Sequence, residues 1–291
     1  MQTCFDNIAQ DVIYQKIRTE YPVQLTIKRL DLIHPQISGN KFYKLKYNLM
    51  EAQRLGYKTV LSFGGAYSNH IAATAYAAQY FGFQSIGIIR GEELAHRPLN
   101  ATLSTAQQHA MQLHFVSREN YKKKQDIEFL TQLQRQFPNS YIIPEGGSND
   151  LAIQGTREIL SPTDQLNYDI ICCAVGTGGT ITGLIEACHN KQYILGFSAL
   201  KGNFLTDIVQ GYTSKTNWSI RDDYCFGGYA KTSAELLSFI EQFEQEQKIP
   251  LDPIYTGKML YGIFDLLKQG YFAANKRILV IHSGGLQGRR H

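Results

Sequence analysis

The sequence lacks any long apolar segment. Nowhere in its 291 residues does an uninterrupted apolar run occur that reaches the ~18 residues needed for a membrane-spanning helix. The first residues, MQTCFDNIAQDV, include acidic side chains and no apolar core, so they do not resemble a secretory signal. We therefore expect a cytoplasmic protein with no membrane partner.

The cysteine and histidine patterns of disulfide frameworks and metal sites are also missing. The five cysteines are odd in number and form no C-x-x-C pair, and the eight histidines form no H-x-x-x-H pair. Cys172 and Cys173 lie in the apolar run IICCAV, which is typical of a buried strand. We expect reduced, structural cysteines and no bound metal.

A strong charge of either sign is absent. The formal net charge is +4, with 19% charged and 43% hydrophobic residues, which is an ordinary globular composition. Because the positive charges are spread along the chain, we expect no nucleic-acid partner. The length suits one large domain or two of modest size.

What the sequence does contain is an alternation of β-branched runs and helical segments. Strands are expected at 22–30, 58–63, 84–90, 112–117, 140–145, 168–176, 193–200 and 277–283. Helices are expected at 40–56, 68–82, 98–110, 178–190, 233–247 and 257–270. This order predicts an α/β protein whose sheets are mostly parallel and are covered by helices on both faces.

Glycine-rich stretches stand where several of these strands end. They read FGGAYSNH, PEGGSND, VGTGGTITG and HSGG. Parallel sheets bind ligands beyond the carboxyl ends of their strands, so these stretches are the expected ligand site. We also expect a domain boundary near residue 148, where GGSND follows a strand and a new helix begins.

The loop from Gly176 to Thr180 predicts a phosphate site, because its glycines let successive N–H groups point inward at the start of a helix. A mononucleotide P-loop requires Gly-Lys-Ser/Thr, and no such triplet occurs in this loop. A dinucleotide loop requires glycine at Ile181 and an acid after the next strand, and both are missing. The remaining candidate ligand is the phosphate of a small cofactor. The alternative is that the loop binds nothing and is a plain strand-to-helix turn.

Three lysines, Lys41, Lys44 and Lys46, follow Gly39 and Asn40 at a predicted helix start. Pyridoxal phosphate needs a phosphate cradle and one lysine whose neutral amine forms a Schiff base with its aldehyde. Lys41 has the most constrained setting. We expect Lys44 and Lys46 to lie on other parts of the helix and to face water.

Five ordered blocks resemble one family: SGNK with KL just after it, SNH, GTGGT, DPIYTGK and HSGG. Over nearly the whole chain they resemble the fold-type-II pyridoxal-phosphate enzymes related to D-cysteine desulfhydrase and 1-aminocyclopropane-1-carboxylate deaminase. The resemblance implies two open, mostly parallel sheets flanked by helices, a tryptophan synthase beta-like fold, and a homodimer. We expect a larger cofactor-binding domain of residues 1–43 and 149–291 and a smaller substrate-side domain of residues 44–148.

The resemblance implies cofactor roles for the matched residues. Lys41 carries pyridoxal 5'-phosphate covalently and moves the substrate's α-proton. Asn69 hydrogen-bonds the phenolic oxygen of the cofactor, and Tyr255 stacks on or beside its ring. The phosphate is bound by Gly176, Thr177, Gly178, Gly179 and Thr180.

The resemblance also implies the substrate side of the site. Ser68 lies at the substrate carboxylate and takes part in proton transfer, next to Asn69 and His70. Tyr229, in DDYCFGGYAK, reaches the substrate. We expect a small amino acid as the substrate.

Thr256 discriminates between the two activities. The deaminases carry a glutamate after the motif tyrosine, at the pyridine nitrogen, where a carboxylate favours the protonated ring and a strong electron sink. A threonine hydroxyl can hydrogen-bond an unprotonated nitrogen but supplies no charge. The weaker sink suffices when a thiolate leaves from Cβ, so Thr256 favours β-elimination.

Two departures from the family concern the substrate. The arginine that commonly follows SNH is replaced by Ala72, and Phe42 and Tyr43 replace the basic residue before KL. Four hypotheses remain: a lyase that converts D-cysteine to pyruvate, ammonia and sulfide; an aminocyclopropane-carboxylate deaminase; a cofactor-binding homologue without lyase activity; and a nucleotide-dependent oxidoreductase, which the incomplete loop motif disfavours.

Overall fold

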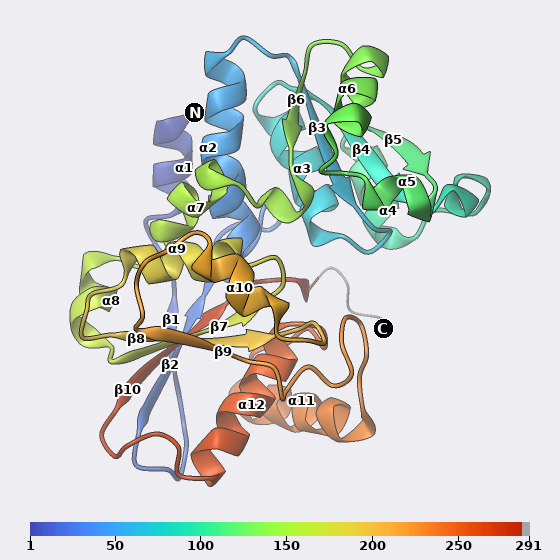
Figure 1. The fold of residues 1–291 in the computed structure, drawn as a ribbon. Coiled ribbons are helices and arrows are strands. Elements are labelled where there is room, and N and C mark those ends of the chain that lie inside the picture. The colour runs from blue at the N-terminus through green and yellow to red at the C-terminus, as the bar shows by residue number, and fades with distance from the viewer. Residues whose placement is uncertain (287–291) are drawn as a thin grey trace.

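The computed structural model describes residues 1–286 and contains two open sheets with helices around them (Figure 1). The larger sheet has six strands in the order β1-β2-β10-β7-β8-β9. Only β1 and β2 pair antiparallel; the other neighbours are parallel. The strands are β1 (Tyr14–Ile17), β2 (Gln24–Arg29), β7 (Ile170–Val175), β8 (Tyr193–Ser198), β9 (Trp218–Arg221) and β10 (Arg277–His282).

The smaller sheet has four parallel strands in the order β5-β4-β3-β6. Its strands are β3 (Thr59–Gly64), β4 (Gln84–Arg90), β5 (Met111–Val116) and β6 (Ser140–Ile143). The helices that connect or extend them are α3 (Asn69–Tyr80), α4 (Ala101–Gln108), α5 (Arg118–Lys122) and α6 (Ile127–Gln136).

Both faces of the larger sheet are buried. On β7, Ile171, Cys173 and Val175 pack into one apolar cluster with residues of α9, whereas Cys172 and Ala174 pack into a second cluster with residues of α12. Alternate side chains of a strand point to opposite faces, so the unbroken apolar run IICCAV fills both cores. The surrounding helices are α7 (Asp150–Arg157), α8 (Pro162–Asn167), α9 (Gly179–Ala187), α10 (Phe204–Gln210), α11 (Ala234–Gln247) and α12 (Thr256–Lys268).

Helix α2 (Asn40–Arg54) joins the two halves, because it packs against α3 of one and α7 of the other. At its crossing with α7 the backbones almost touch: a Cβ on Gly155 would lie 2.0 Å from the carbonyl oxygen of Tyr43. The side chain of Lys46 on this helix is buried, not water-facing as predicted, and its Nζ lies 2.7 Å from carboxylates of both Asp6 and Glu158. Asp6 belongs to α1 (Gln2–Ile8). The prediction was wrong because α2 is covered on several sides.

The α/β class, with two mostly parallel sheets flanked by helices, is confirmed, as are all eight expected strands and six expected helices within a few residues. β1, β9 and several short helices had not been predicted. Within residues 1–286, no helix is both long and apolar enough to cross a bilayer. The predicted boundary at residues 43 and 44 falls inside the continuous helix α2, and the division into two domains stays a prediction.

Candidate active site

A cavity of about 400 Å³ lies where the two halves meet. Its walls come from the start of α2, the loop after β3, the ends of β4 and β6, the loop between β7 and α9, and the segments 252–255 and 283–285. Most of these segments follow the carboxyl end of a strand, as expected for a ligand site on parallel sheets.

Lys41 enters this cavity from the first turn of α2. The turn is held from outside, since Gly39 has φ +68° and the amide of Asn40 donates to the carbonyl oxygen of Ser283 at 3.2 Å. Burial lowers the pKa of the Lys41 amine to about 8, although the carboxylate of Glu145 opposes this shift. An amine with this pKa is partly neutral near neutral pH, as a nucleophile requires.

Lys44 also lines the cavity, which corrects the expectation that it faces water. Only 2% of the residue is exposed, because residues three apart on a helix share one face and this face carries Lys41. Its Nζ lies 3.0 Å from the carbonyl oxygen of Gly146, 3.2 Å from Ser148 Oγ and 3.4 Å from Thr177 Oγ1. Burial and the charge of Lys41 lower the pKa of Lys44 well below its usual value.

The glycine loop that is predicted to bind phosphate lines the cavity and leads into the start of α9. Gly178, with φ +84°, is the N-cap of α9, and Thr180 in its first turn accepts a hydrogen bond from Asn40 Nδ2 at 2.8 Å. The first N–H groups of a helix have no intrahelical partner and attract anions. Within the described residues, Lys44 contacts only neutral oxygens beside this loop. A buried amine and a helix start that share one cavity wall fit a phosphate group.

The first two residues of α3, Asn69 and His70, line the cavity and each carry one acceptor that has no partner within residues 1–286. Ser62 Oγ donates to the carbonyl oxygen of Ile143 at 2.9 Å, so it accepts the proton on His70 Nε2 at 2.8 Å. That tautomer leaves His70 Nδ1 as an acceptor, and among the described residues neither this buried atom nor the buried Asn69 Oδ1 has a hydrogen-bond partner. Burial, followed by the charges of Lys41 and Lys44, lowers the pKa of His70 well below its usual value. These neutral, unsatisfied groups suit a polar ligand.

Ser68 is the N-cap of α3, and its Oγ accepts from the amide of Ile71 at 3.3 Å. Its hydroxyl proton therefore stays available for an acceptor in the cavity. The positive end of the 12-residue helix α3 lies at the same place. These groups suit an anion.

Asp252 fixes the opposite wall. One carboxylate oxygen accepts from the amides of Ile254 and Tyr255, and the other accepts from the amide and the hydroxyl of Thr256, all at 2.7–2.9 Å. These bonds start α12 and hold the Tyr255 ring in the cavity wall, where a Cβ on Gly176 would lie 3.1 Å from it. Thr256 itself is fully buried and does not line the cavity.

Tyr229 lies at the cavity beside Tyr255, with ring centroids 6.3 Å apart in an edge-on arrangement. Burial raises the pKa of both phenols, so both are neutral donors at physiological pH. The Tyr229 residue is 45% exposed, which places it at the cavity opening. The long loop before α11 supplies it from a distant part of the sequence.

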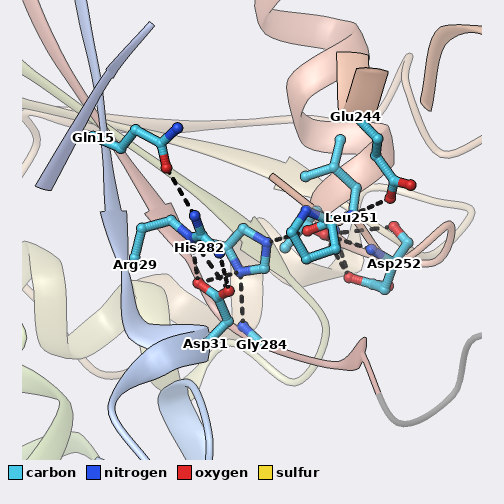
Figure 2. A network of polar contacts seen from close by, with 10 residues as sticks. Gln15, Arg29, Asp31, Glu244, Leu251, Asp252, His282 and Gly284 are labelled. Carbon is cyan, nitrogen blue, oxygen red and sulfur yellow. Dashed lines mark hydrogen bonds and ion pairs between the residues drawn. The ribbon is translucent and has the colours of Figure 1, made fainter. Parts of the chain in front are cut away.

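A buried polar network includes Gly284, in the segment 283–285 that lines the cavity (Figure 2). Arg29 holds the carboxylate of Asp31 with two nitrogens, and Asp31 lies 3.2 Å from His282 Nδ1. His282 Nε2 donates to the carbonyl oxygen of Pro250 at 2.8 Å, and its Nδ1 lies 3.3 Å from the amide of Gly284. The network ties the end of β10 to the segments before α2 and α12, both of which line the cavity.

Most of the predicted site residues lie together at this cavity. The ones that line it are Lys41, Ser68, Asn69, His70, Gly176, Thr177, Gly178, Thr180, Tyr229 and Tyr255. Gly179 and Thr256 lie just behind its surface: a Cβ on Gly179 would be 3.3 Å from Lys44 Nζ, and Thr256 contacts Asp252. The roles assigned to these residues stay predictions.

Several cavity residues escaped the sequence reasoning: Asn40, Lys44, Arg90, Glu145 and Asp252. A signal existed for two of them. Arg90 and Glu145 end the strand segments predicted at 84–90 and 140–145, and polar residues at the carboxyl ends of parallel strands commonly face a ligand.

Comparison with known proteins agrees with this geometry. The family described as "Pyridoxal-phosphate dependent enzyme" matches residues 12–284. A Thermotoga maritima protein, provisionally named a 1-aminocyclopropane-1-carboxylate deaminase, is 32% identical over 94% of this chain and 92% of its own. The Arabidopsis thaliana mitochondrial bifunctional D-cysteine desulfhydrase/1-aminocyclopropane-1-carboxylate deaminase is 31% identical over 91% of this chain and 73% of its own.

A solved structure described as an ACC deaminase homologue superposes with a TM-score of 0.82 at 28% identity, covering 97% of this chain and 91% of that one. The buried Lys41 amine, the glycine loop at the start of α9 and these relatives agree. The chain belongs to the fold-type-II pyridoxal-phosphate-dependent enzymes, in the family of 1-aminocyclopropane-1-carboxylate deaminase and D-cysteine desulfhydrase.

Proposed function

We propose that the protein is a lyase that performs β-elimination on a small D-amino acid, namely D-cysteine, which it converts to pyruvate, ammonia and hydrogen sulfide. The observation that carries the choice is Thr256, where the deaminases have a glutamate. The carboxylate of the same segment, Asp252, already accepts four hydrogen bonds. Neither residue offers a free negative charge to a pyridine nitrogen, which supports a weak electron sink and a good leaving group on Cβ.

Pyridoxal phosphate, when bound, supplies the electron sink that stabilises negative charge at the substrate's α-carbon. The Gly176–Thr180 loop and Lys44 would hold its phosphate, and Asn69 and Tyr255 would hold its ring. Lys41 would be the lysine that carries the cofactor, and its amine is placed in the cavity to accept the substrate's α-proton. To donate to a ring nitrogen, the Thr256 hydroxyl has to give up its 2.7 Å bond to Asp252.

The substrate is oriented by the start of α3 and by the opening. Ser68 and the first amides of α3 bind its carboxylate, and His70 Nδ1 accepts from a nearby donor. Tyr229 covers the opening and keeps water from the α-carbon. We also propose that the enzyme is a cytoplasmic homodimer; light scattering of the purified protein tests the dimer.

The relatives favour a second candidate, because several carry the deaminase name. The test incubates the purified holoenzyme with D-cysteine and, separately, with 1-aminocyclopropane-1-carboxylate, and uses Lys41→Ala to correct for sulfide released by free cofactor. Sulfide and pyruvate from D-cysteine support the lyase. Turnover of the cyclopropane without sulfide release supports the deaminase, and no turnover of either supports a homologue without lyase activity.

The lowered pKa of Lys41 predicts how apo-protein captures the cofactor. Only the neutral amine attacks an aldehyde, so the rate of covalent capture should rise with pH and level off above about 8. Glu145, Lys44 and His70 are the neighbouring titratable groups whose charges interact with that of Lys41. All three are retained in this experiment. Stopped-flow absorbance between pH 6 and about 10.5 measures the rate. A rate that continues to rise to the ordinary lysine pKa, 10.5, would show that Lys41 is not buried.

A methyl group on the cradle should weaken cofactor binding. Gly178 has φ +84°, which alanine adopts only at a cost of about 1–2 kcal/mol, so Gly178→Ala should shift the loop and its N–H groups. We expect cofactor affinity to fall at least about tenfold, corresponding to about 1.4 kcal/mol. Gly82→Ala is the control, with φ +79° and nothing within 4 Å. If Gly178→Ala and Gly82→Ala bind the cofactor with equal affinity, the loop does not bind its phosphate and is only a strand-to-helix turn.

A further inference from the structure

We propose that Arg90 is a specificity-determining residue that selects substrates whose Cβ substituent carries negative charge. The proposal deepens the proposed function and rests on it, since it concerns the substituent that the lyase removes. It names a chemical class: thiolates, sulfonates, carboxylates and phosphates on the β-carbon of a small amino acid.

The position of Arg90 brings its guanidinium to the cavity. Arg90 is the last residue of β4, is exposed and lines the cavity wall. Its guanidinium lies against the loop after β3, because a Cβ on Gly65 would be 3.5 Å from one of its terminal nitrogens. On another side, its central carbon lies 5.9 Å from the ring centroid of Tyr121. The loop at Gly65 and the ring of Tyr121 therefore restrict the orientation of the Arg90 side chain.

Arg90 has no carboxylate partner within ion-pair distance among residues 1–286, whereas Arg118 and Lys124 each have one. Arg118 pairs with Glu93 at 2.7 Å, and Lys124 pairs with Glu145 at 3.4 Å. Glu145 also accepts from the phenol of Tyr121 at 2.6 Å. Glu145 is thus engaged by two other groups, and within residues 1–286 the guanidinium of Arg90 forms no ion pair.

The other anionic groups of the expected ligands already have binding groups. Under the proposed function, Lys44 and the start of α9 would hold the cofactor phosphate, and Ser68 and the start of α3 would hold the substrate carboxylate. A substrate with one carboxylate and an uncharged side chain leaves the guanidinium without a role. A second anion on the substrate matches it, because guanidinium groups bind oxyanions through two parallel hydrogen bonds.

D-cysteine fits the same class. A free cysteine thiol has a pKa of about 8.5, and a nearby guanidinium lowers it by favouring the thiolate. Arg90 also shares the field of Tyr229 at the cavity opening, since its charge favours ionisation of that phenol while Glu145 opposes it. Because both residues line the cavity, we place the substituent end of the substrate between Arg90 and Tyr229.

The test compares two amino acids that differ only in charge at this end. Aspartate and asparagine have the same number of heavy atoms, and neither carries a β-leaving group of the thiol type. Each enantiomer is titrated into the holoenzyme, and binding is followed by the absorbance of the cofactor and by inhibition of 3-chloroalanine turnover. Wild type should bind aspartate about tenfold more tightly than asparagine, the low end of the range for charge-assisted hydrogen bonds because Arg90 is exposed.

In Arg90→Gln this preference should disappear, with asparagine affinity unchanged within about twofold, and in Arg90→Lys it should be intermediate. Arg118→Gln is the control: Arg118 is equally cationic but pairs with Glu93, and it should keep the preference. If Arg90→Gln weakens the affinity for aspartate and for asparagine equally, Arg90 lies at the α-carboxylate and the proposal is overturned. A wild-type enzyme that does not prefer aspartate to asparagine would also overturn it.

Failure of the proposed function gives a different result. If the protein is not a lyase, 3-chloroalanine is not turned over, but the absorbance titration still reports the ratio of aspartate to asparagine affinity. A preference that depends on Arg90 then survives without elimination. If elimination occurs but the enzyme does not prefer aspartate to asparagine, the proposed lyase activity is supported and the proposed role of Arg90 is refuted.

Discussion

Lys41→Ala should lower the rate of β-elimination by at least about a thousandfold and abolish covalent attachment of the cofactor. The amine is the group that binds the cofactor aldehyde and then takes the α-proton, and alanine does neither. The Gly176–Thr180 loop and Lys44 remain in this variant, so free cofactor should still bind. Activity assays and equilibrium dialysis measure the two effects separately.

The matched control is Lys44→Ala. Both lysines are on one face of α2, and burial lowers the pKa of each. Lys44→Ala should weaken cofactor affinity but retain covalent attachment. If Lys44→Ala abolishes attachment while Lys41→Ala retains it, the two roles are reversed.

Gly39→Ala should be more disruptive than alanine at any of the glycines that line the cavity, although Gly39 itself does not line it. Its φ is +68°, and an added Cβ would lie 1.9 Å from the carbonyl oxygen of Ser283. The clash is with backbone, so either the segment 283–285 or the start of α2 has to move. We expect a loss of about 3 kcal/mol in the free energy of unfolding.

The activity of Gly39→Ala should fall by at least about a hundredfold. Lys41 is only two residues away, and small displacements of a catalytic group greatly reduce the rate. Gly56→Ala is the control, with φ +78° and nothing within 4 Å; it should cost about 1 kcal/mol and keep its activity. Urea unfolding and substrate turnover give the two quantities. Equal unfolding midpoints for the two variants would contradict the close contact with Ser283.

The fold could be predicted because its central strands are unbroken apolar runs. Segments such as IICCAV are buried on both faces of a parallel sheet, and few other structures use such a pattern. The strands that escaped prediction, β1 and β9, are four residues each and largely exposed or half-buried. Their weak patterns become strands only because a neighbouring strand offers hydrogen bonds.

The site could be predicted only where a motif marked it. Lys41 and the glycine loop carry local sequence signals, but the environment of Lys46 does not. Its two carboxylate partners, Asp6 and Glu158, are 40 and 112 residues away in the sequence. Charge alone favours exposure, and only the packing of α1 and α7 against α2 reverses it. The same holds for the link from Arg29 through Asp31 to His282, which joins both ends of the chain (Figure 2).

The most direct test of the account is to find which lysine carries the cofactor. Holoenzyme is reduced with borohydride, digested and mapped by mass spectrometry, with Lys41→Ala and Lys44→Ala treated in parallel. The account predicts that wild type and Lys44→Ala carry the reduced cofactor on Lys41 and that Lys41→Ala carries none. A reduced cofactor on Lys44 or Lys46 in wild type, with Lys41 unmodified, would contradict it.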